Sequence, residues 1–422
     1  MSAAAIRVSV LHTRQQQHKR ATAYTLIKDM KWILLALKVL AVVPFFQVVQ
    51  PYKIALPKKQ SFASLYPTLL RLFCFIGTLL YLFMIFSPFA KISIFIYGEM
   101  DNATIALELL LGPLSSVIIL WKSAQKSKNF VIIINLLLGV DKELQRHAHA
   151  PRALENKCAH LERYMWLPLF HVVAICLLQG LHMRKCTSSI YCVSMYFFYM
   201  VLHAIIISYV IWVATLLHLL AVRFRYLNDF IKIYTTRQGA RLKRTVDMTS
   251  APETFTADML LIYREYNNLL AIHKKLNDLV HITLLVFIAY FSYSSTLSMY
   301  QVYRTLTKLE DMNVRGILWC LIYLCVHVPI VALLMRRSDV ATKEANGISR
   351  VVARIYGRGT AQQRLIDKFL TFSIKQDVQF TAFDFFPINM STLFNICSTI
   401  IAYVVILIQF KQLNETTAEA SA

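Results

Sequence analysis

Polar and aromatic side chains recur inside long apolar stretches of this sequence, and they are the groups best placed to do chemistry. Burying a polar group in lipid is costly, so residues of this kind mark function by default. Tyr199 and His203, for example, are spaced to share one face of a helix,. The candidate residues all fall in the outer half of an expected helical bundle: Glu108, Gln179, Tyr199, His203, Tyr293, Tyr300, Trp319 and Tyr323.

These residues have two interpretations. An aromatic wall with a few hydrogen-bonding groups is what a small organic ligand requires. The alternative is the interfacial aromatic belt of membrane proteins, which enriches Tyr and Trp at the same depth. The belt does not readily explain Glu108, His203 or Trp319, so these three favour a ligand pocket.

Patterns typical of enzymes and metal sites are absent from the sequence. It contains no CxxC pair, no phosphate-binding glycine loop and no nucleophile elbow,. His147 and His149 lie in a polar loop without neighbouring cysteines, which favours a solvated face over a metal site,. Cys186 and Cys192 flank a short outer loop and could form a disulfide there,. We therefore expect no enzymatic activity, no cofactor and no metal.

The composition predicts a helical membrane protein. Of 422 residues, 57% are hydrophobic and 16% are charged, whereas soluble chains are about 25% charged. The apolar residues fall in runs near the length that crosses a ~30 Å hydrocarbon core at 1.5 Å per residue. We expect an all-α membrane protein with seven transmembrane helices, at about 67–89, 102–121, 163–183, 190–218, 279–303, 313–335 and 387–410.

The basic residues predict the orientation. A net charge of +22 would suggest nucleic acid as a partner of a soluble protein,, but cytoplasmic loops of membrane proteins collect Lys and Arg. Of the 45 basic residues, 36 fall in the alternate segments 1–66, 122–162, 219–278 and 336–386, and six in the others. We therefore expect an intracellular N-terminus, an extracellular C-terminus and no nucleic-acid partner. The glycosylation sequons at Asn102 and Asn414 would then lie outside.

Three regions follow from this topology. Residues 1–66 would be a cytoplasmic N-terminus whose apolar run, 32–46, forms an interfacial or re-entrant helix, because it is short, contains Pro44 and has basic flanks,. Residues 67–335 would form a six-helix bundle with a ligand pocket. Residues 336–422 would supply a cytoplasmic anchor and the last helix. Helical periodicity at 227–234 and 258–278 indicates that helices continue into a cytoplasmic bundle,.

The last expected span has two unlike faces. One stripe is small or polar except for Ile406, and it comprises Ser391, Asn395, Thr399, Ala402, Ile406 and Gln409. The opposite face carries Leu393, Ile400, Val404 and Leu407. Such a helix could expose one side to water and pack the other against its neighbours, although small residues also serve helix–helix packing. A lone helix cannot enclose water, so a pore would need several copies around a symmetry axis.

The end of the chain resembles a known signature. Ala402-Tyr403, five apolar residues and Gln409-Phe410 are similar to the Thr-Tyr…Gln-Phe motif of the insect gustatory receptor family. Residues 380–389, Phe-Thr-Ala-Phe-Asp-Phe-Phe-Pro-Ile-Asn, resemble the stretch that precedes this helix in the family. Two departures are Ala402 in place of Thr, and Phe383-Asp384 where Cys-Gly is common. Val404 stands where sugar-sensing members carry Glu, so other tastants remain open.

The resemblance implies a tastant-gated, non-selective cation channel. Its expected partners are membrane lipid, a small-molecule tastant, monovalent and divalent cations, and related subunits in a homo- or heterotetramer. It would lie in the plasma membrane of chemosensory neurons. The expected pore and gate residues are Asn395, Thr399, Tyr403, Ile406, Gln409 and Phe410. The alternatives are an odorant-receptor-type channel, with the same architecture, and a seven-span G-protein-coupled receptor, with the opposite orientation. A secondary transporter would show internal repeats.

Overall fold

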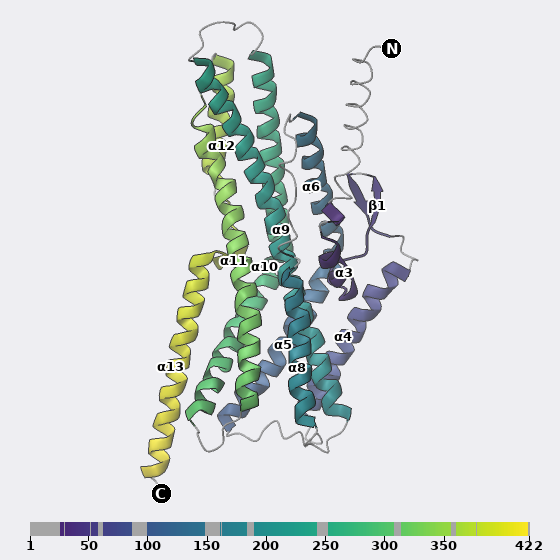
Figure 1. Ribbon diagram of the computed structural model, residues 1–422, viewed down its shortest axis with the longest axis vertical. Coiled ribbons are helices and arrows are strands. Elements are labelled where there is room, and N and C mark those ends of the chain that lie inside the picture. Colours follow the sequence, from purple (N-terminus) through teal and green to yellow (C-terminus); the bar gives the residue numbers. More distant parts are fainter. Residues whose placement is uncertain are drawn as a thin grey trace, which may run out of the picture.

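The chain forms an elongated bundle of helices packed side by side (Figure 1). The computed structural model describes residues 26–28, 30–50, 52–57, 62–86, 99–147, 161, 163–183, 190–242, 252–307, 314–355, 360–376 and 378–420. Helices dominate because backbone N–H and C=O groups inside a bilayer must be satisfied within the chain.

Seven long helices correspond to the seven expected spans. They are α4 (Phe62–Phe86), α5 (Glu99–Gln125), α8 (Trp166–Met183), α9 (Ile190–Leu242), α10 (Pro252–Thr307), α11 (Val314–Val352) and α13 (Met390–Ala420). Within the described residues, α4, α9, α10, α11 and α13 each contain a stretch long and apolar enough to cross a membrane. The helices α5 and α8 lie in the same bundle, where both pack against α9.

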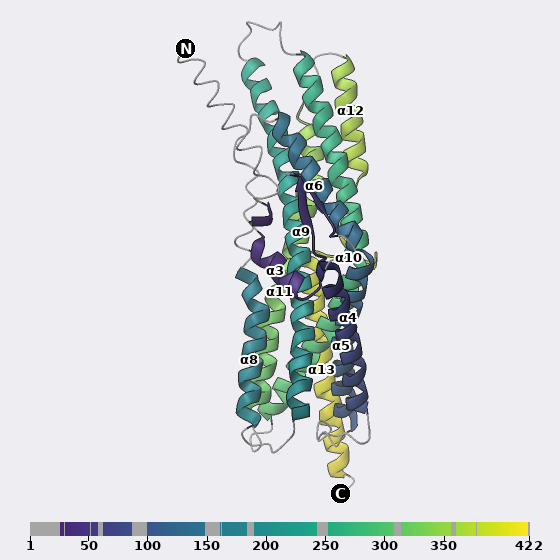
Figure 2. The ribbon, with the colours of Figure 1, turned by 90° about the vertical axis from the view of Figure 1, so that its right-hand side faces the viewer.

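Several helices are far longer than a membrane is thick. At 1.5 Å per residue, α9 and α10 each extend about 80 Å, against a hydrocarbon core of ~30 Å. Their ends supply the helices that the periodicity at 227–234 and 258–278 predicts. Together with the end of α11, α6 (Ser127–His147) and α12 (Thr360–Lys375), they form a second bundle beyond the apolar one (Figure 2).

The N-terminal apolar run forms a short helix and not a span. The helix α3 (Lys31–Val39) has nine residues, about 14 Å, which is too short to cross a bilayer. Its inner face, Ile33, Leu34 and Leu37, is buried, while Trp32 and Leu35 are exposed. At its end Tyr66 of α4 donates a hydrogen bond to the Val39 carbonyl at 2.6 Å.

Two small hairpins correct the expectation of a purely helical chain. The strand β1 (Gln47–Gln50) pairs antiparallel with β2 (Lys53–Ala55), and β3 (Thr381–Ala382) with β4 (Phe386–Pro387). Prolines lie beside or within both segments, at positions 44, 51 and 57 and at position 387, where each removes a main-chain donor and fixes φ,. Strands this short carry too few residues to show a two-residue periodicity, so they leave no signal in the sequence.

A buried ion pair joins α9 to α6. Arg223 of α9 forms two hydrogen bonds with the carboxylate of Asp141 of α6, at 2.7 and 3.1 Å. The two side chains are 0% and 1% exposed. The third guanidinium nitrogen of Arg223, Nη1, donates to the Leu219 carbonyl at 2.9 Å. Because both charges are desolvated, each requires the other.

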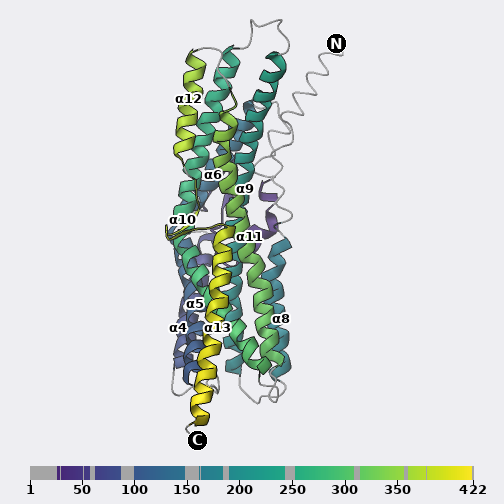
Figure 3. The same ribbon diagram turned by 90° about the vertical axis from the view of Figure 1, so that its left-hand side faces the viewer.

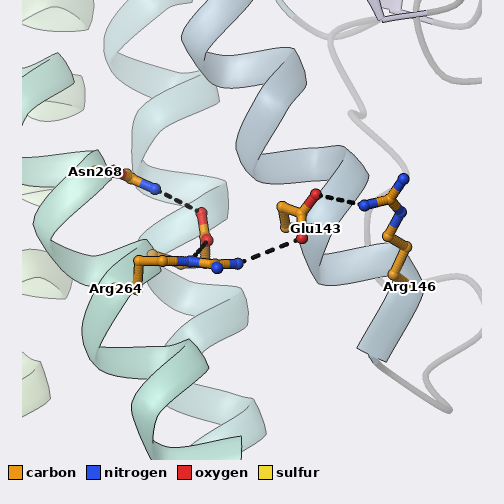
Figure 4. A network of polar contacts seen from close by, with 5 residues as sticks. Glu143, Arg146, Arg264 and Asn268 are labelled. Atoms are coloured by element: carbon orange, nitrogen blue, oxygen red, sulfur yellow. Dashed lines mark hydrogen bonds and ion pairs between the residues drawn. The ribbon is translucent and has the colours of Figure 1, made fainter.

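A more exposed network joins α6 to α10 (Figure 4). Glu143 of α6 pairs with Arg146 at 2.9 Å and with Arg264 of α10 at 3.3 Å. Arg264 also pairs with the buried carboxylate of Glu265, which accepts a hydrogen bond from Asn268 at 3.0 Å. Exposed pairs of this kind contribute little individually, so the network mainly fixes the relative position of the two helices.

Three asparagines hold distant segments by using both ends of the side-chain amide. Each asparagine accepts a hydrogen bond from the main-chain N–H of one distant residue and donates a hydrogen bond to an oxygen atom of that distant residue. The donor–acceptor distances lie between 2.8 and 3.2 Å. The pairs are Asn135 with Ile54, Asn277 with Thr381, and Asn346 with Val378. The first ties the β1–β2 hairpin to α6, and the others tie the segment before α13 to α10 and α11.

The buried ion pair predicts an asymmetric response to substitution. Asp141→Ala leaves the Arg223 guanidinium buried without a counter-charge, so the free energy of unfolding should fall by about 3 kcal/mol or more. Replacing both residues, as Asp141→Leu with Arg223→Met, should recover most of the loss. Thermal and denaturant unfolding of the detergent-solubilised protein measures both effects.

The matched control is Asp229→Ala, which removes a carboxylate paired with Lys232 at an exposed position. Its effect should stay within about 1 kcal/mol. Equal losses from Asp141→Ala and Asp229→Ala would contradict the importance given to the buried pair.

Candidate ligand pocket and pore helix

Histidine and tyrosine side chains from four helices meet inside the apolar bundle. This histidine–tyrosine cluster consists of His171 of α8, Tyr199 and His203 of α9, Tyr290 of α10, and Tyr323 and His327 of α11. All six side chains are buried. His203 lies at the centre, because its ring is 5.6 Å from that of His171, 5.7 Å from that of His327 and 4.3 Å from that of Tyr199.

The cluster has more hydrogen-bonding capacity than it uses. Tyr290 Oη lies 3.0 Å from His203 Nε2, and His327 Nδ1 lies 3.0 Å from the Tyr323 carbonyl. Within the described residues, no partner is present for either ring nitrogen of His171, for His203 Nδ1 or for His327 Nε2. A buried polar atom without a partner costs about 1–3 kcal/mol. The cluster is therefore suited to a ligand that supplies hydrogen bonds.

The helix α5 packs beside this cluster at Gly112. A Cβ at Gly112 would lie 3.4 Å from Tyr290 Oη and 3.5 Å from Tyr199 Cε2, which is ordinary van der Waals contact. The helix α5 thus forms the remaining wall of the site.

The structure brings together some of the predicted ligand residues and separates others. Tyr199, His203 and Tyr323 belong to the cluster, and Trp319 packs against the buried group of Tyr81, Tyr199 and Met200. Tyr293 and Tyr300 are half-buried further along α10. The side chains of two further predicted residues, Glu108 and Gln179, lie outside the described residues. The ligand-binding role of all eight stays a prediction.

Sequence reasoning missed His171, Tyr290 and His327. The signal was available for the two histidines, since each interrupts an apolar helix, as His203 does,. The ligand residues were expected only in the outer half of the bundle. His203 lies about 20 Å along α9 from Ile190 at 1.5 Å per residue, so the cluster is nearer the middle of the helices than expected.

The last helix differs from the others in how little of it the chain covers. Only 11% of the apolar stretch of α13 is buried against the rest of the chain, whereas 89% of the apolar stretch of α9 is buried. Figures 1 and 3 show α13 at one edge of the bundle, where it packs against α10 and α11. Leu393, Ile400 and Val404 form its buried face, as their spacing predicts.

The remainder of α13 divides into two further faces at 100° per residue. The predicted pore and gate residues, Asn395, Thr399, Tyr403, Ile406, Gln409 and Phe410, are all exposed and lie on one side of the helix. Phe394, Ile401 and Val405 are exposed on another side and are wholly apolar. The helix therefore presents a packed face, a largely polar face and a separate apolar face.

A tight turn leads into α13 at one of the departures noted in the sequence. Phe383 and Asp384 both have positive φ, 53° and 59°, a conformation that glycine adopts more readily. The turn closes through a bond from Phe385 N–H to the Ala382 carbonyl at 3.1 Å and another from Thr381 Oγ1 to the Asp384 carboxylate at 2.7 Å. These two hydrogen bonds hold the backbone in a conformation that a glycine at position 384 would adopt without strain,.

Other predicted sites are only partly visible. Cys186 lies outside the described residues, as does the side chain of Cys192 in α9. Asn102 and Asn414 lie within α5 and α13, which disfavours glycosylation because acceptor sites lie in surface loops. Among the described residues no group of histidines, cysteines or carboxylates could hold a metal ion.

Comparison with known proteins decides the family. Residues 30–414 match the family described as 7tm Chemosensory receptor. The Drosophila melanogaster Gustatory and pheromone receptor 32a is 32% identical over 414 residues, which cover 94% of this chain and 88% of the relative. This chain belongs to the insect gustatory receptor family. The Drosophila melanogaster Gustatory receptor 68a is 34% identical over 215 residues, about half of each chain.

The fold of this gustatory receptor is also that of a solved chemosensory receptor. The insect olfactory receptor OR5 from Machilis hrabei, in complex with eugenol, matches with a TM-score of 0.66 over 91% of this chain and 99% of that chain. A second OR5 structure has the same TM-score. Sequence identity is 12%, so the likeness concerns the fold. The chain is thus a membrane-spanning helical receptor, in a receptor family and not an enzyme family.

The cluster predicts different effects for two similar substitutions on α10. Tyr290→Phe removes the hydroxyl that pairs with His203, so the free energy of unfolding should fall by about 1–3 kcal/mol. Tyr266→Phe removes an equally buried hydroxyl, but one without a hydrogen-bond partner among the described residues. It should be neutral or stabilising. Unfolding of both purified variants without ligand tests this, and an equal loss in the two would contradict it.

Proposed function

We propose that this gustatory receptor is a tastant-gated, non-selective cation channel in which α13 lines the pore. The observation that carries the proposal is the division of α13 into three faces. A pore-lining helix must pack against its own subunit, face water and contact a neighbouring subunit or lipid. The buried face of Leu393, Ile400 and Val404, the polar face and the exposed apolar face fit these three surroundings.

The pore would require several copies of the chain. One helix cannot enclose water, and related copies around an axis can. A homotetramer, or a heterotetramer with related gustatory receptor subunits, is the assembly we propose. In it Gln409 and Phe410 form the narrow ring, and dewetting at the Phe410 rings closes the pore to monovalent and divalent cations.

The ligand would bind at the histidine–tyrosine cluster. The free nitrogens of His171, His203 and His327 offer hydrogen bonds, and the surrounding rings offer apolar contact. The relative named a gustatory and pheromone receptor supports a small organic tastant or pheromone as the ligand class. Such a ligand changes gating only by the difference in its affinity for the closed and open states.

The two sites are connected through shared helices. Tyr290 lies on α10, and Tyr323 and His327 lie on α11. The same two helices carry Asn277 and Asn346, which hold the segment leading into α13. A ligand that shifts α10 against α11 would therefore move the start of the pore helix.

The proposed setting is the plasma membrane of chemosensory neurons, with the N-terminus inside and the C-terminus outside. An epitope after Ala422 should be accessible to antibody on intact cells, and one inserted between α9 and α10 only after permeabilisation. The reverse pattern would match the G-protein-coupled receptor alternative and would remove the channel proposal.

Cysteine accessibility tests the pore. In a Cys397→Ser background, Thr399→Cys places a thiol on the polar face and Ile401→Cys places one on the exposed apolar face. A charged thiol reagent reacts with the thiolate, which forms in water and not in lipid. During agonist application the reagent should change the current through Thr399→Cys at least about tenfold faster than through Ile401→Cys.

The gate has its own measurement. Phe410→Ala should raise the basal leak, and Gln409→Ala should change permeability or rectification, in patch recordings without G-protein signalling. Normal surface expression with unchanged conduction in both variants would contradict the assignment of the gate.

The ligand site is tested with the most central residue. In calcium imaging against a tastant panel, His203→Phe should raise the half-maximal ligand concentration by about tenfold, the loss of one buried hydrogen bond. Basal leak should stay unchanged, because His203 lies on α9, whereas α13 packs mainly against α10 and α11. A leftward shift or an unaltered response would place the ligand elsewhere.

A further inference from the structure

A hollow lies at the level of α3, where the end of α5 and the start of α6 meet α9, α10 and the turn after α3. About 410 Å³ of space lies within its rim, open solvent included, and the part that admits water-sized groups is about 30 Å³. Its apolar wall includes Phe130 and Trp212, and its polar side consists of Lys122, Ser123 and Lys126. We call this site the basic hollow. None of the predicted ligand or pore residues lines it.

The two lysines of the basic hollow are not neutralised. Lys122 and Lys126 are one helical turn apart, and both are half-buried. In the part of the chain that the structure describes, neither forms an ion pair, although Lys126 donates to the Asp278 carbonyl. By contrast, the more exposed Lys232 and Lys343 each pair with a carboxylate.

Two more cations are held against the same turn. Arg71 of α4 donates a hydrogen bond to the Ala41 carbonyl at 3.1 Å. Lys38 lies 4.1 Å from the centre of the Phe46 ring, and Phe46 in turn packs against Phe130 of the hollow. Neither cation forms an ion pair with a described carboxylate. Asp278, the one carboxylate that acts on Lys126, leaves the site positive.

Burial without a counter-charge affects these lysines directly. Desolvation lowers the pKa of Lys126, the charge of Lys122 lowers it further, and Asp278 offsets part of this. Desolvation also lowers the pKa of Lys38. An anion placed between Lys122 and Lys126 would reverse this penalty, because an opposite charge favours the protonated amines.

An apolar stripe leads along α5 to the basic hollow. Leu107, Leu114 and Trp121 are exposed and recur every seven residues, so they lie on one side of the helix,. Trp121 immediately precedes Lys122, and tryptophan is enriched where hydrocarbon meets the headgroups. The stripe offers acyl chains a path along α5 to the turn that carries Lys122. The geometry thus suits a molecule with an anionic head and apolar tails.

We propose that the basic hollow binds the phosphorylated headgroup of an anionic phospholipid, with a phosphate between Lys122 and Lys126 and the acyl chains along Leu114 and Trp121. Basic pockets between transmembrane helices hold such headgroups on the cytoplasmic side. Only the assignment to the inner leaflet depends on the proposed orientation. Binding itself requires neither ion conduction nor a tastant, so it goes beyond the proposed function.

The experiment measures lipid binding to the purified full-length receptor. Native mass spectrometry follows a titration with phosphatidylinositol 4-phosphate, and with phosphatidylcholine of the same chain length for comparison. The receptor should retain the phosphorylated lipid preferentially. Lys122→Gln with Lys126→Gln should raise its Kd by about tenfold or more, since each lysine near an anionic headgroup contributes to affinity.

The control and the filling variant separate the site from general charge. Lys232→Gln with Lys343→Gln removes the same charge from exposed positions and should change the Kd less than about twofold. Ser123→Phe keeps both lysines and fills the hollow, so it should weaken binding as the double lysine variant does. If the double variant does not fold, by gel filtration, Lys122→Gln alone and Ser123→Phe decide.

Three outcomes would overturn the proposal. The first is equal retention of the two lipids by the unsubstituted receptor, and the second is equal loss of affinity in the site and control variants. The third is displacement of the lipid by free inositol bisphosphate at equal concentration, which would identify a soluble anion as the occupant. Since no current is measured, a failed channel proposal leaves these results interpretable.

Discussion

Two charges removed from water, Arg223 and Asp141, fix the position of α6 against α9. Separating them would leave a buried ion, which costs far more than any single apolar contact contributes, so α6 stays in register with α9. The position of α6 then determines that of the β1–β2 hairpin through Asn135, and the hairpin continues from α3. The helix α9 in turn carries Tyr199 and His203. The placement of the β1–β2 hairpin, and of α3 before it, thus depends in part on one pair of side chains.

The large helices were predictable because each follows from a strong and simple signal. Apolar runs gave the seven spans, three- and four-residue spacing gave their extensions, and the same spacing separated the buried face of α13, with Leu393 and Val404, from its polar face. The hairpins were not predictable, because β3 and β4 have two residues each and their pairing is stabilised by side chains far away in the sequence. Asn277 is separated from Thr381 by about a quarter of the chain.

The candidate pocket was predictable in kind and only partly in detail. The cost of burying polar groups pointed to His203, and the structure adds His171 and His327 for the same reason. On α10 the residue that pairs with His203 is Tyr290, about one turn before the expected Tyr293. Residues three apart share a helix side, so only the depth of each span against its neighbours distinguishes them. That depth is a property of packing between helices.

The two asparagines that hold the segment before α13 form hydrogen bonds chiefly with main-chain atoms. Asn346 binds the N–H and C=O of Val378, and Asn277 binds the N–H of Thr381. Such bonds form whatever side chain position 378 carries, and they lie on helices whose other turns hold the histidines and tyrosines. In the proposed channel, recognition and transmission would therefore rest on separate sets of atoms within the same two helices. A receptor of this design would bind a different ligand after exchange of its interior rings, while the bonds to the main chain before α13 stay the same.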